Sequence, residues 1–187
     1  IHLNARSIPR HKTLIEAESN KFDIITCSET WFTASHTKED ADLAYFHSPV
    51  RLDRSGQGGG GVAIYVKRHL MCKHRLDLHT PGLEAVWIET KLNKELLLVG
   101  SFYRQPSLGT NYWELVQENF RKVNNTGLKY IALGDFNSDF NFPSKHLLDI
   151  INTFQLHQLT NSDTRITDTS STRIDLVLTQ TPQIVKH

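Results

Sequence analysis

The sequence predicts one layered α/β domain, and three observations lead to this fold class. Short runs rich in β-branched and aromatic residues alternate along the chain with segments of helical periodicity. The 187 residues, of which 39% are hydrophobic and 22% charged, are typical of a single globular domain and not of a disordered chain. Residues 96–99 are apolar at every position, as expected of a strand covered on both faces.

Each predicted element follows from its own local pattern. Six segments are predicted as strands because each is brief, apolar and bounded by polar residues or glycine: residues 22–27, 62–66, 83–90, 96–103, 130–133 and 174–178. Three segments have helical character, in two of them with apolar residues spaced three and four apart: residues 12–19, 112–123 and 145–154. Ser144 is a suitable N-cap for the last of these helices. Two long loops are predicted at residues 33–55 and 160–172, and such loops often carry binding residues.

Charge and cysteine content exclude several classes of protein. Lys and Arg number 21 against 20 Asp and Glu, so the net charge of +1 argues neither for nor against a polyanionic partner. Cys27 and Cys72 are too few for a disulfide scaffold and lack the Cys-x-x-Cys spacing of zinc ribbons and thioredoxin-like proteins. No stretch approaches the ~20 apolar residues that a membrane span needs, so we expect no membrane partner.

The glycine-rich segment at residues 56–61 invites comparison with phosphate-binding loops. A Walker loop is excluded because no Lys-Ser or Lys-Thr follows and the next element is a strand. A dinucleotide fingerprint would have to lie between a strand and a helix, which also excludes it. We therefore predict a turn that enters the strand at residues 62–66.

The strand at residues 130–133 ends in glycine and then delivers Asp135 and Asn137 with Phe136 between them. Alternation along an extended chain sends Asp135 and Asn137 to one face and Phe136 to the core. The two polar side chains would then share a site at a strand end. An Asx-type turn after the strand explains the same residues equally well.

Two further carboxylates stand at strand ends. Glu29 closely follows the strand at residues 22–27, a position suited to a Mg²⁺ ligand, because Mg²⁺ binds one or two protein carboxylates plus water and phosphate oxygens. Asp175 lies near the start of the strand at residues 174–178 and would need a partner if buried. The alternatives are a solvated Glu29 and an ion pair of Asp175 with Arg165 or Arg173.

Seven short motifs follow one another in a recognisable order. They are residues 3–7 (Leu-Asn-Ala-Arg-Ser), 28–31 (Ser-Glu-Thr-Trp), 59–65 (Gly-Gly-Gly-Val-Ala-Ile-Tyr), 103–106 (Tyr-Arg-Gln-Pro), 134–137 (Gly-Asp-Phe-Asn), 164–165 (Thr-Arg) and 171–175 (Ser-Thr-Arg-Ile-Asp). Together they resemble the endonuclease/exonuclease/phosphatase superfamily, which has the fold of deoxyribonuclease I and the apurinic/apyrimidinic endonucleases. They are most similar to the endonuclease domain of non-LTR retrotransposons. Each motif alone is weak, whereas seven in order are specific.

The resemblance implies a fold and an activity. The fold would be a four-layered α/β/β/α sandwich formed by residues 1–187 as one domain, with two sheets face to face and helices outside. The activity would be that of a Mg²⁺-dependent DNA endonuclease, with Mn²⁺ as an alternative metal, that nicks target DNA for retrotransposition. A reverse transcriptase domain in the full-length polyprotein and a nuclear location are implied in the same way.

The resemblance also implies roles for residues at the matching positions. Glu29 would be the main Mg²⁺ ligand, helped by Asn4. The implied substrate-binding residues are Asn4, Arg104, Thr164 and Arg165. The implied catalytic residues are Tyr103 on the scissile phosphate, Asp135 and Asn137 on the attacking water, and Asp175, which would orient a catalytic histidine. Phosphodiester hydrolysis needs these parts: a placed nucleophile and positive charge beside the phosphate oxygens.

The sequence departs from the family pattern after Asp175. The closing Ser-Asp-His motif of the family is absent from these 187 residues. His187 is the only histidine after Asp175, and at 12 positions on it comes too early by the family spacing. We therefore expect the domain to be incomplete at its C-terminus, without its last strand or strands and a metal-proximal Asp.

Two alternative functions remain at this point. The missing Ser-Asp-His motif favours a catalytically inactive remnant that keeps the fold or binds nucleic acid without cutting it. A phosphatase or phosphodiesterase of the same superfamily, acting on lipids or small phosphates, is the second alternative. The motifs at residues 28–31 and 103–106 are typical of retrotransposon endonucleases and argue against that second alternative.

Overall fold

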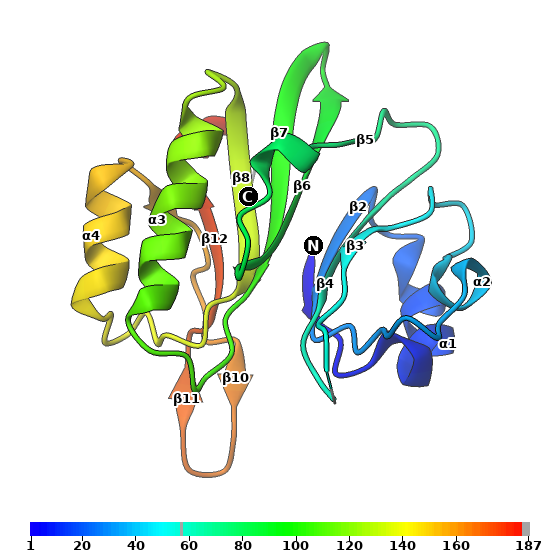
Figure 1. The fold of residues 1–187 in the computed structure, drawn as a ribbon, viewed down its shortest axis with the longest axis horizontal. Helices are drawn as coiled ribbons and strands as arrows, with labels where there is room; N and C mark the ends of the chain where they lie inside the picture. Colours follow the sequence, from blue (N-terminus) through cyan, green and yellow to red (C-terminus); the bar gives the residue numbers. More distant parts are fainter. Residues whose placement is uncertain (57, 185–187) are drawn as a thin grey trace.

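Two β-sheets lie face to face at the centre of the computed structural model, with helices on both outer sides (Figure 1). The structure describes residues 1–56 and 58–184. The four layers run in the order helices, six-stranded sheet, four-stranded sheet, helices, which confirms the predicted α/β/β/α sandwich. Within the described residues, no helix combines the length and the apolar character that crossing a membrane requires.

The first sheet is built from the N-terminal third of the chain. Its strands are β1 (His2–Asn4), β2 (Ile24–Ser28), β4 (Val62–Val66) and β3 (Val50–Leu52), in that spatial order. Only β1 and β2 are parallel. The helices α1 (Ile8–Ser19) and α2 (Lys38–Ala41) cover its outer face. The Ser7 side chain accepts a hydrogen bond from the Arg10 amide, and Pro9 occupies the first turn, so α1 begins before the predicted residue 12.

The second sheet takes up most of the remaining chain. Its spatial order is β5 (Lys73–His74), β6 (Glu84–Leu92), β7 (Glu95–Tyr103), β8 (Lys129–Asp135), β12 (Asp175–Thr179) and β9 (His157–Gln158). The helices α3 (Asn111–Asn124) and α4 (Lys145–Thr153) cover the outer face, and two 3₁₀ turns lie at η1 (Leu76–Leu78) and η2 (Pro182–Ile184). As predicted, the Ser144 side chain caps α4 by accepting a hydrogen bond from the Leu147 amide at 3.3 Å.

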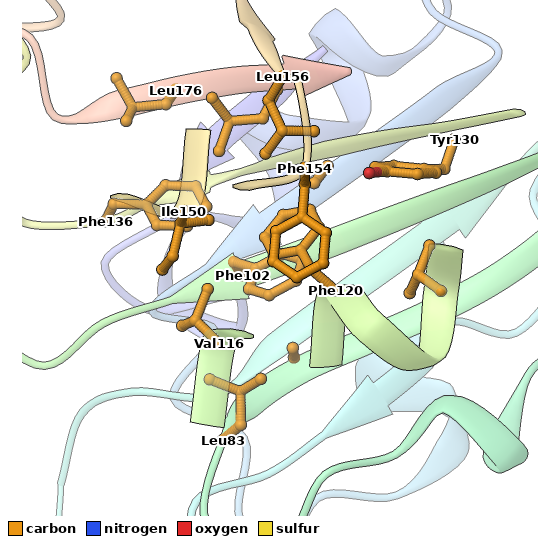
Figure 2. Packing of buried hydrophobic residues seen from close by; sticks show 14 of the residues in the cluster. Leu83, Phe102, Val116, Phe120, Tyr130, Phe136, Ile150, Phe154, Leu156 and Leu176 are labelled. Atoms are coloured by element: carbon orange, nitrogen blue, oxygen red, sulfur yellow. The ribbon is translucent and has the colours of Figure 1, made fainter. Parts of the chain in front are cut away.

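Three apolar layers hold the sandwich together: one between the sheets and one under each helical layer. Figure 2 shows the largest of them, in which Phe120 of α3 and Ile150 of α4 pack against the second sheet. Phe136 points into this layer and its ring stacks on Phe102 with the ring centres 5.6 Å apart. The prediction that Phe136 faces the core while its polar neighbours face the other way is thereby confirmed.

The six predicted strands and three predicted helices are all present, but the two predicted loops are partly wrong. Residues 33–55 contain α2, which a Thr37–Asp40 capping box begins, and the strand β3. Residues 160–172 contain a hairpin of β10 (Arg165–Ile166) and β11 (Ser171–Thr172), which extends away from both sheets in Figure 1. Elements of two to four residues are too short to show a periodicity, so the pattern of the sequence could not reveal them.

Candidate active site

A row of four polar side chains crosses the second sheet at one end. Glu84 of β6 pairs in register with Tyr103 of β7, Tyr103 with Asp135 of β8, and Asp135 with Asp175 of β12. Residues paired in register point to the same face of a sheet, and this face looks toward the first sheet. Segments up to 91 residues apart in the sequence therefore place three carboxylates and one phenol side by side.

The first sheet supplies two more polar side chains from its parallel pair of strands. Asn4 ends β1, and Glu29 directly follows β2. The Asn4 Nδ2 group donates one hydrogen bond to Glu29 Oε1 and one to Asp135 Oδ2, both at 2.9 Å. A single side-chain amide thus joins two carboxylates that belong to different sheets, and it fixes the two sheets relative to each other at this point.

Asp135 is almost fully buried, and its two oxygens are used differently. Oδ2 faces Asn4, whereas Oδ1 accepts a hydrogen bond from the Asn137 backbone amide at 2.9 Å. This second bond is an Asx-type turn, so the turn and the shared site exist together and are not alternatives. Burial, followed by the nearby Asp175 carboxylate, raises the pKa of Asp135 to about 6.

The backbone around these residues is held in an uncommon conformation. Arg6, Ser7, Glu29, Trp31 and Asn137 all have positive φ although none is glycine. Each such residue costs of order 1 kcal/mol or more, and such strain often gathers at functional sites. Hydrogen bonds between neighbouring loops hold the strained turns, with the Ser7 amide donating to Glu29 O at 2.9 Å and the Trp31 amide to Gly60 O at 3.0 Å.

These groups open onto a cleft of about 770 Å³. Four residues with predicted metal or water-activating roles line it: Asn4, Glu29, Asp135 and Asn137. Three further predicted residues line it as well: Thr164, Arg165 and Asp175. The structure therefore brings together seven of the nine residues that the sequence singled out, although 171 positions separate the first from the last.

Tyr103, the eighth predicted residue, lies beside the cleft and does not line it. It is buried, and it neighbours Asp135 in the sheet. Burial, and then the negative charge of Glu29, raise the pKa of Tyr103 to about 12. The phenol therefore keeps its proton at neutral pH and is available as a hydrogen-bond donor.

The guanidinium of Arg104, the ninth predicted residue, is bound by other groups of the same chain. Its guanidinium donates to Asn137 O at 3.1 Å and to Leu108 O at 2.7 Å, and it lies over the rings of Tyr112 and Trp113. In return the Asn137 side-chain amide donates to Arg104 O at 2.6 Å. These contacts favour a role in holding the Asn137 turn, and a role of Arg104 in binding substrate stays a prediction.

The alternative interpretation of Asp175, an ion pair with Arg165 or Arg173, is wrong, because neither arginine pairs with it in the described chain. Its Oδ1 lies 3.6 Å from His2 Nε2, and Arg173 lies near Asp163 instead. The backbone amide of Asp175 is held by Thr164 Oγ1 at 3.0 Å. Burial raises the pKa of this carboxyl, since its charge is only partly compensated.

His2 is one of four site residues that the sequence analysis missed. Its Nδ1 lies 2.9 Å from Thr26 Oγ1, and burial lowers its pKa to about 3, so the imidazole is neutral at ordinary pH. Arg6 and Trp31 line the cleft, and Glu84 extends the row of polar side chains. Glu84 and Asp175 share one sequence signal, a carboxylate at the start of an apolar strand.

His187, the only histidine that follows Asp175 in the sequence, lies outside the described residues.

The donor atoms of the cleft suit a hard divalent cation. Glu29 and Asp135 supply carboxylate oxygens and Asn4 supplies an amide oxygen, which are the ligand types that Mg²⁺ and Mn²⁺ prefer. The Asn4 Oδ1 and Asp175 Oδ1 atoms are buried and have no hydrogen-bond partner among the described residues. Within those residues no group of three or more His, Cys, Asp or Glu side chains is close enough to enclose a metal. The arrangement therefore fits a cation held by few protein ligands together with water and phosphate oxygens.

Several solved structures share this fold. The endonuclease domain of TRAS1, a telomere-specific non-LTR retrotransposon, has a TM-score of 0.72 at 19% identity, over 95% of this chain and 81% of that chain. The catalytic domain of Xenopus laevis APE2 has a TM-score of 0.71 at 18% identity, over 95% and 81%. An AP endonuclease from Archaeoglobus fulgidus has a TM-score of 0.69 at 15% identity, over 97% and 86%. At these identities the likeness shows the fold alone.

Sequence comparison goes further than the fold. No curated protein matches the chain by sequence. Residues 2–186, nearly the whole chain, match the profile of one family of hydrolases over the strands and loops that form the cleft, and so the protein belongs to the Endonuclease/Exonuclease/phosphatase family.

Proposed function

We propose that this protein is a DNA endonuclease that hydrolyses phosphodiester bonds with the help of Mg²⁺, or of Mn²⁺ in its place. The observation that carries the proposal is the Asn4 amide between the Glu29 and Asp135 carboxylates, all three of which line a cleft of about 770 Å³. Target nicking for retrotransposition, a partner reverse transcriptase domain and a nuclear location are the finer parts of the same proposal.

The residues of the cleft divide the chemistry between them. Asp135, with a pKa near 6, is largely ionised at neutral pH, yet it is basic enough to accept a proton from an attacking water. The Asn137 turn fixes the orientation of this carboxylate. The Tyr103 phenol is suited to donate a hydrogen bond to a phosphate oxygen. A cation held by Glu29 and Asn4 would supply positive charge to the phosphate oxygens.

The rim of the cleft supports DNA as the substrate. Arg6 and Arg165 line it and are both exposed, which suits contact with backbone phosphates on either side of the cut. Trp31 also lines the cleft, with 39% of its surface exposed, and its ring offers a face on which a base can stack. A small phosphate substrate would not need a ring for base stacking.

An inactive remnant of such an enzyme is the second candidate function, and one observation favours it. The imidazole beside Asp175 is that of His2, which is buried, neutral and bound to Thr26. His2 is therefore a poor general acid for the leaving group. Measuring cleavage and metal binding on the same protein separates the two candidates.

Nicking of supercoiled plasmid DNA in Mg²⁺ tests the proposal. We expect slow nicking by the wild-type protein, no nicking in EDTA, and a loss of about 10²-fold or more in Glu29→Gln and Asp135→Asn, because each removes a group that acts on the reacting atoms. Glu95→Gln is the matched control, since Glu95 pairs with Lys129 at the far end of the same sheet. Mn²⁺ binding without any nicking would favour the remnant, and hydrolysis of phosphomonoesters in place of plasmid would favour a phosphatase.

A further inference from the structure

An ion pair joins the two sheets at the end where the cleft opens. Arg54 follows β3 of the first sheet, and Glu84 begins β6 of the second. The Arg54 Nε group donates to Glu84 Oε1 at 2.7 Å, and Nη2 lies 2.6 Å from the same oxygen. Most of the surface of both side chains is covered, with 22% and 17% left exposed. None of the roles assigned to the cleft uses this pair.

Both members of the pair adjoin Tyr103. The Arg54 guanidinium carbon lies 5.4 Å from the centre of the Tyr103 ring, within the range of a cation–π interaction. Glu84 is the register partner of Tyr103 on the neighbouring strand, so the two side chains leave the sheet on the same face. The Tyr103 ring therefore has Arg54 over its face and Glu84 beside it, and these two hydrogen-bonded charges restrict the positions that the phenol can adopt.

The same pair also holds the glycine segment that enters β4. The Gly61 amide donates to Glu84 Oε2 at 2.6 Å. Gly60 and Gly61 have φ values of +71° and +83°, and a Cβ atom at Gly60 would overlap the Arg54 guanidinium. Only glycine therefore lets the backbone pass this closely over the ion pair.

The glycine segment in turn holds the residues that follow Glu29. Gly60 O accepts from the Trp31 amide at 3.0 Å, and Gly61 O accepts from the Thr30 amide at 3.3 Å. These bonds support the strained turn in which Glu29 and Trp31 have φ values of 50° and 57°. A continuous path of contacts thus runs from Arg54 and Glu84 to the proposed metal ligand on one side and to the proposed phosphate contact on the other.

We propose that Arg54 and Glu84 are positioning residues, which hold the Tyr103 phenol and the Glu29 turn in a fixed spatial relation across the two sheets. The proposal deepens the proposed function and rests on it, because Tyr103 and Glu29 matter to the reaction only if the cleft is catalytic. Stability alone is a weak reason for the pair, since the desolvation of two charges offsets most of the gain from their attraction. Residues that orient groups around a metal typically contribute 10- to 100-fold to affinity or rate.

The chain contains a matched control for this pair. Arg75, which follows β5, forms an ion pair with Glu89 of β6, with Nη1 and Oε2 2.9 Å apart and 13% of each side chain exposed. Glu89 lies on the same strand β6 as Glu84 but farther along it. Neither Arg75 nor Glu89 lines the cleft. Arg54→Met removes one well-covered ion pair to β6, whereas Arg75→Met removes one to β6 and a second, more exposed one to Asp77. A purely structural effect should therefore be at least as large in Arg75→Met as in Arg54→Met.

The test compares Arg54→Met, Arg75→Met and the wild type. Three quantities are measured: the Mn²⁺ affinity by calorimetry, the plasmid-nicking rate at saturating DNA, and the NMR signals of ¹³C-labelled tyrosine rings. The Tyr103 signal is assigned as the one that disappears in Tyr103→Phe. We expect Arg54→Met to shift the Tyr103 signal, to weaken Mn²⁺ binding about 10-fold and to slow nicking 10- to 100-fold with a smaller change in KM. Arg75→Met should change none of these. Arg54→Lys should recover little, because an ammonium reproduces neither the planar stacking nor the paired donors.

The outcomes decide between positioning and structure. An unchanged Tyr103 signal in Arg54→Met, or equal losses in Arg54→Met and Arg75→Met, would overturn the proposal. If Arg54→Met does not fold, Glu84→Gln replaces it, since Gln keeps the size of the side chain and loses its charge. The NMR measurement needs no activity, so a wild-type protein that neither binds Mn²⁺ nor nicks DNA would refute the proposed function while the Tyr103 signal still tests the positioning.

Discussion

Asp135 illustrates at the scale of one residue how the site is prepared at the expense of stability. Its carboxylate is nearly buried and lies beside Asp175. It is compensated by hydrogen bonds from Asn4 and Asn137, but among the described residues no cationic side chain forms an ion pair with it. Ionising it in the folded protein is therefore harder than in the unfolded chain, which is why its pKa rises from 3.8 to about 6. Such a shift is a penalty on stability in the metal-free state.

The sign of this penalty gives a testable pH dependence. Because the pKa is higher in the folded state, the penalty is absent below about pH 4, grows as the pH rises from 3.8 to about 6, and is constant above that. In EDTA, Asp135→Asn should therefore gain about 1–3 kcal/mol relative to the wild type between pH 4 and pH 8. Urea denaturation at both pH values measures the change. A stability difference that does not vary with pH would show that Asp135 is not strained by its charge.

The Asp175 Oδ1 atom is buried and accepts no hydrogen bond from the described residues. The nearest ring, that of His2, lies 3.6 Å away and is bound to Thr26. If Asp175 orients a catalytic imidazole, added imidazole should accelerate nicking by the wild-type protein at constant pH and ionic strength, by up to the ~10²-fold typical of a general acid or base. The acceleration should disappear in Asp175→Ala. Nicking that is independent of imidazole in both proteins would contradict the assigned role of Asp175.

At the scale of the elements, length separates what the sequence could predict from what it could not. The strands β6, β7 and β8 and the helices α3 and α4 are long enough for their apolar pattern to be read. The strands β1, β3 and β10 have two or three residues, and pairing with distant partners defines them. The same distinction applies to the site. Glu29 and Asp135 come at the ends of strands whose apolar pattern is visible in the sequence. Glu84 and His2 reach the site through the pairing register of their strands with distant strands.

The glycine segment before β4 offers a prediction at this scale. Gly58 and Gly60 have nearly equal φ values, +69° and +71°, but a Cβ atom would meet open space at Gly58 and the Arg54 guanidinium at Gly60. Gly58→Ala should therefore cost only the ~1 kcal/mol of left-handed backbone strain. Gly60→Ala should cost more, because it adds displacement of the ion pair. Thermal denaturation measures both, and equal losses would mean that Arg54 moves aside freely.

At the scale of the whole molecule, the cleft depends on how the two sheets are placed relative to each other. Asn4 and Glu29 come from the first sheet, and Asp135 comes from the second. Neither sheet carries the full set of oxygen ligands. Sequence reasoning found these residues one at a time, at the ends of strands, and a family resemblance suggested that they meet. The packing of the sheets, which no local pattern encodes, brings them within hydrogen-bond distance of one amide.

A cation bound between the sheets should therefore stabilise the entire fold. A ligand that binds only the folded state at 100 times its Kd adds about 2.7 kcal/mol, which for a domain of this size raises Tm by about 5–10 °C. We expect Mn²⁺ to produce such a rise at pH 7.5, where Asp135 is ionised. We expect Glu29→Gln and Asp135→Asn each to lose most of the rise in Tm, although the two residues belong to different sheets. Glu95→Gln, at the far end of the second sheet, should keep the full rise. Differential scanning calorimetry with and without Mn²⁺ measures it, and a rise that survives in either cleft variant would place the cation somewhere other than between Glu29 and Asp135.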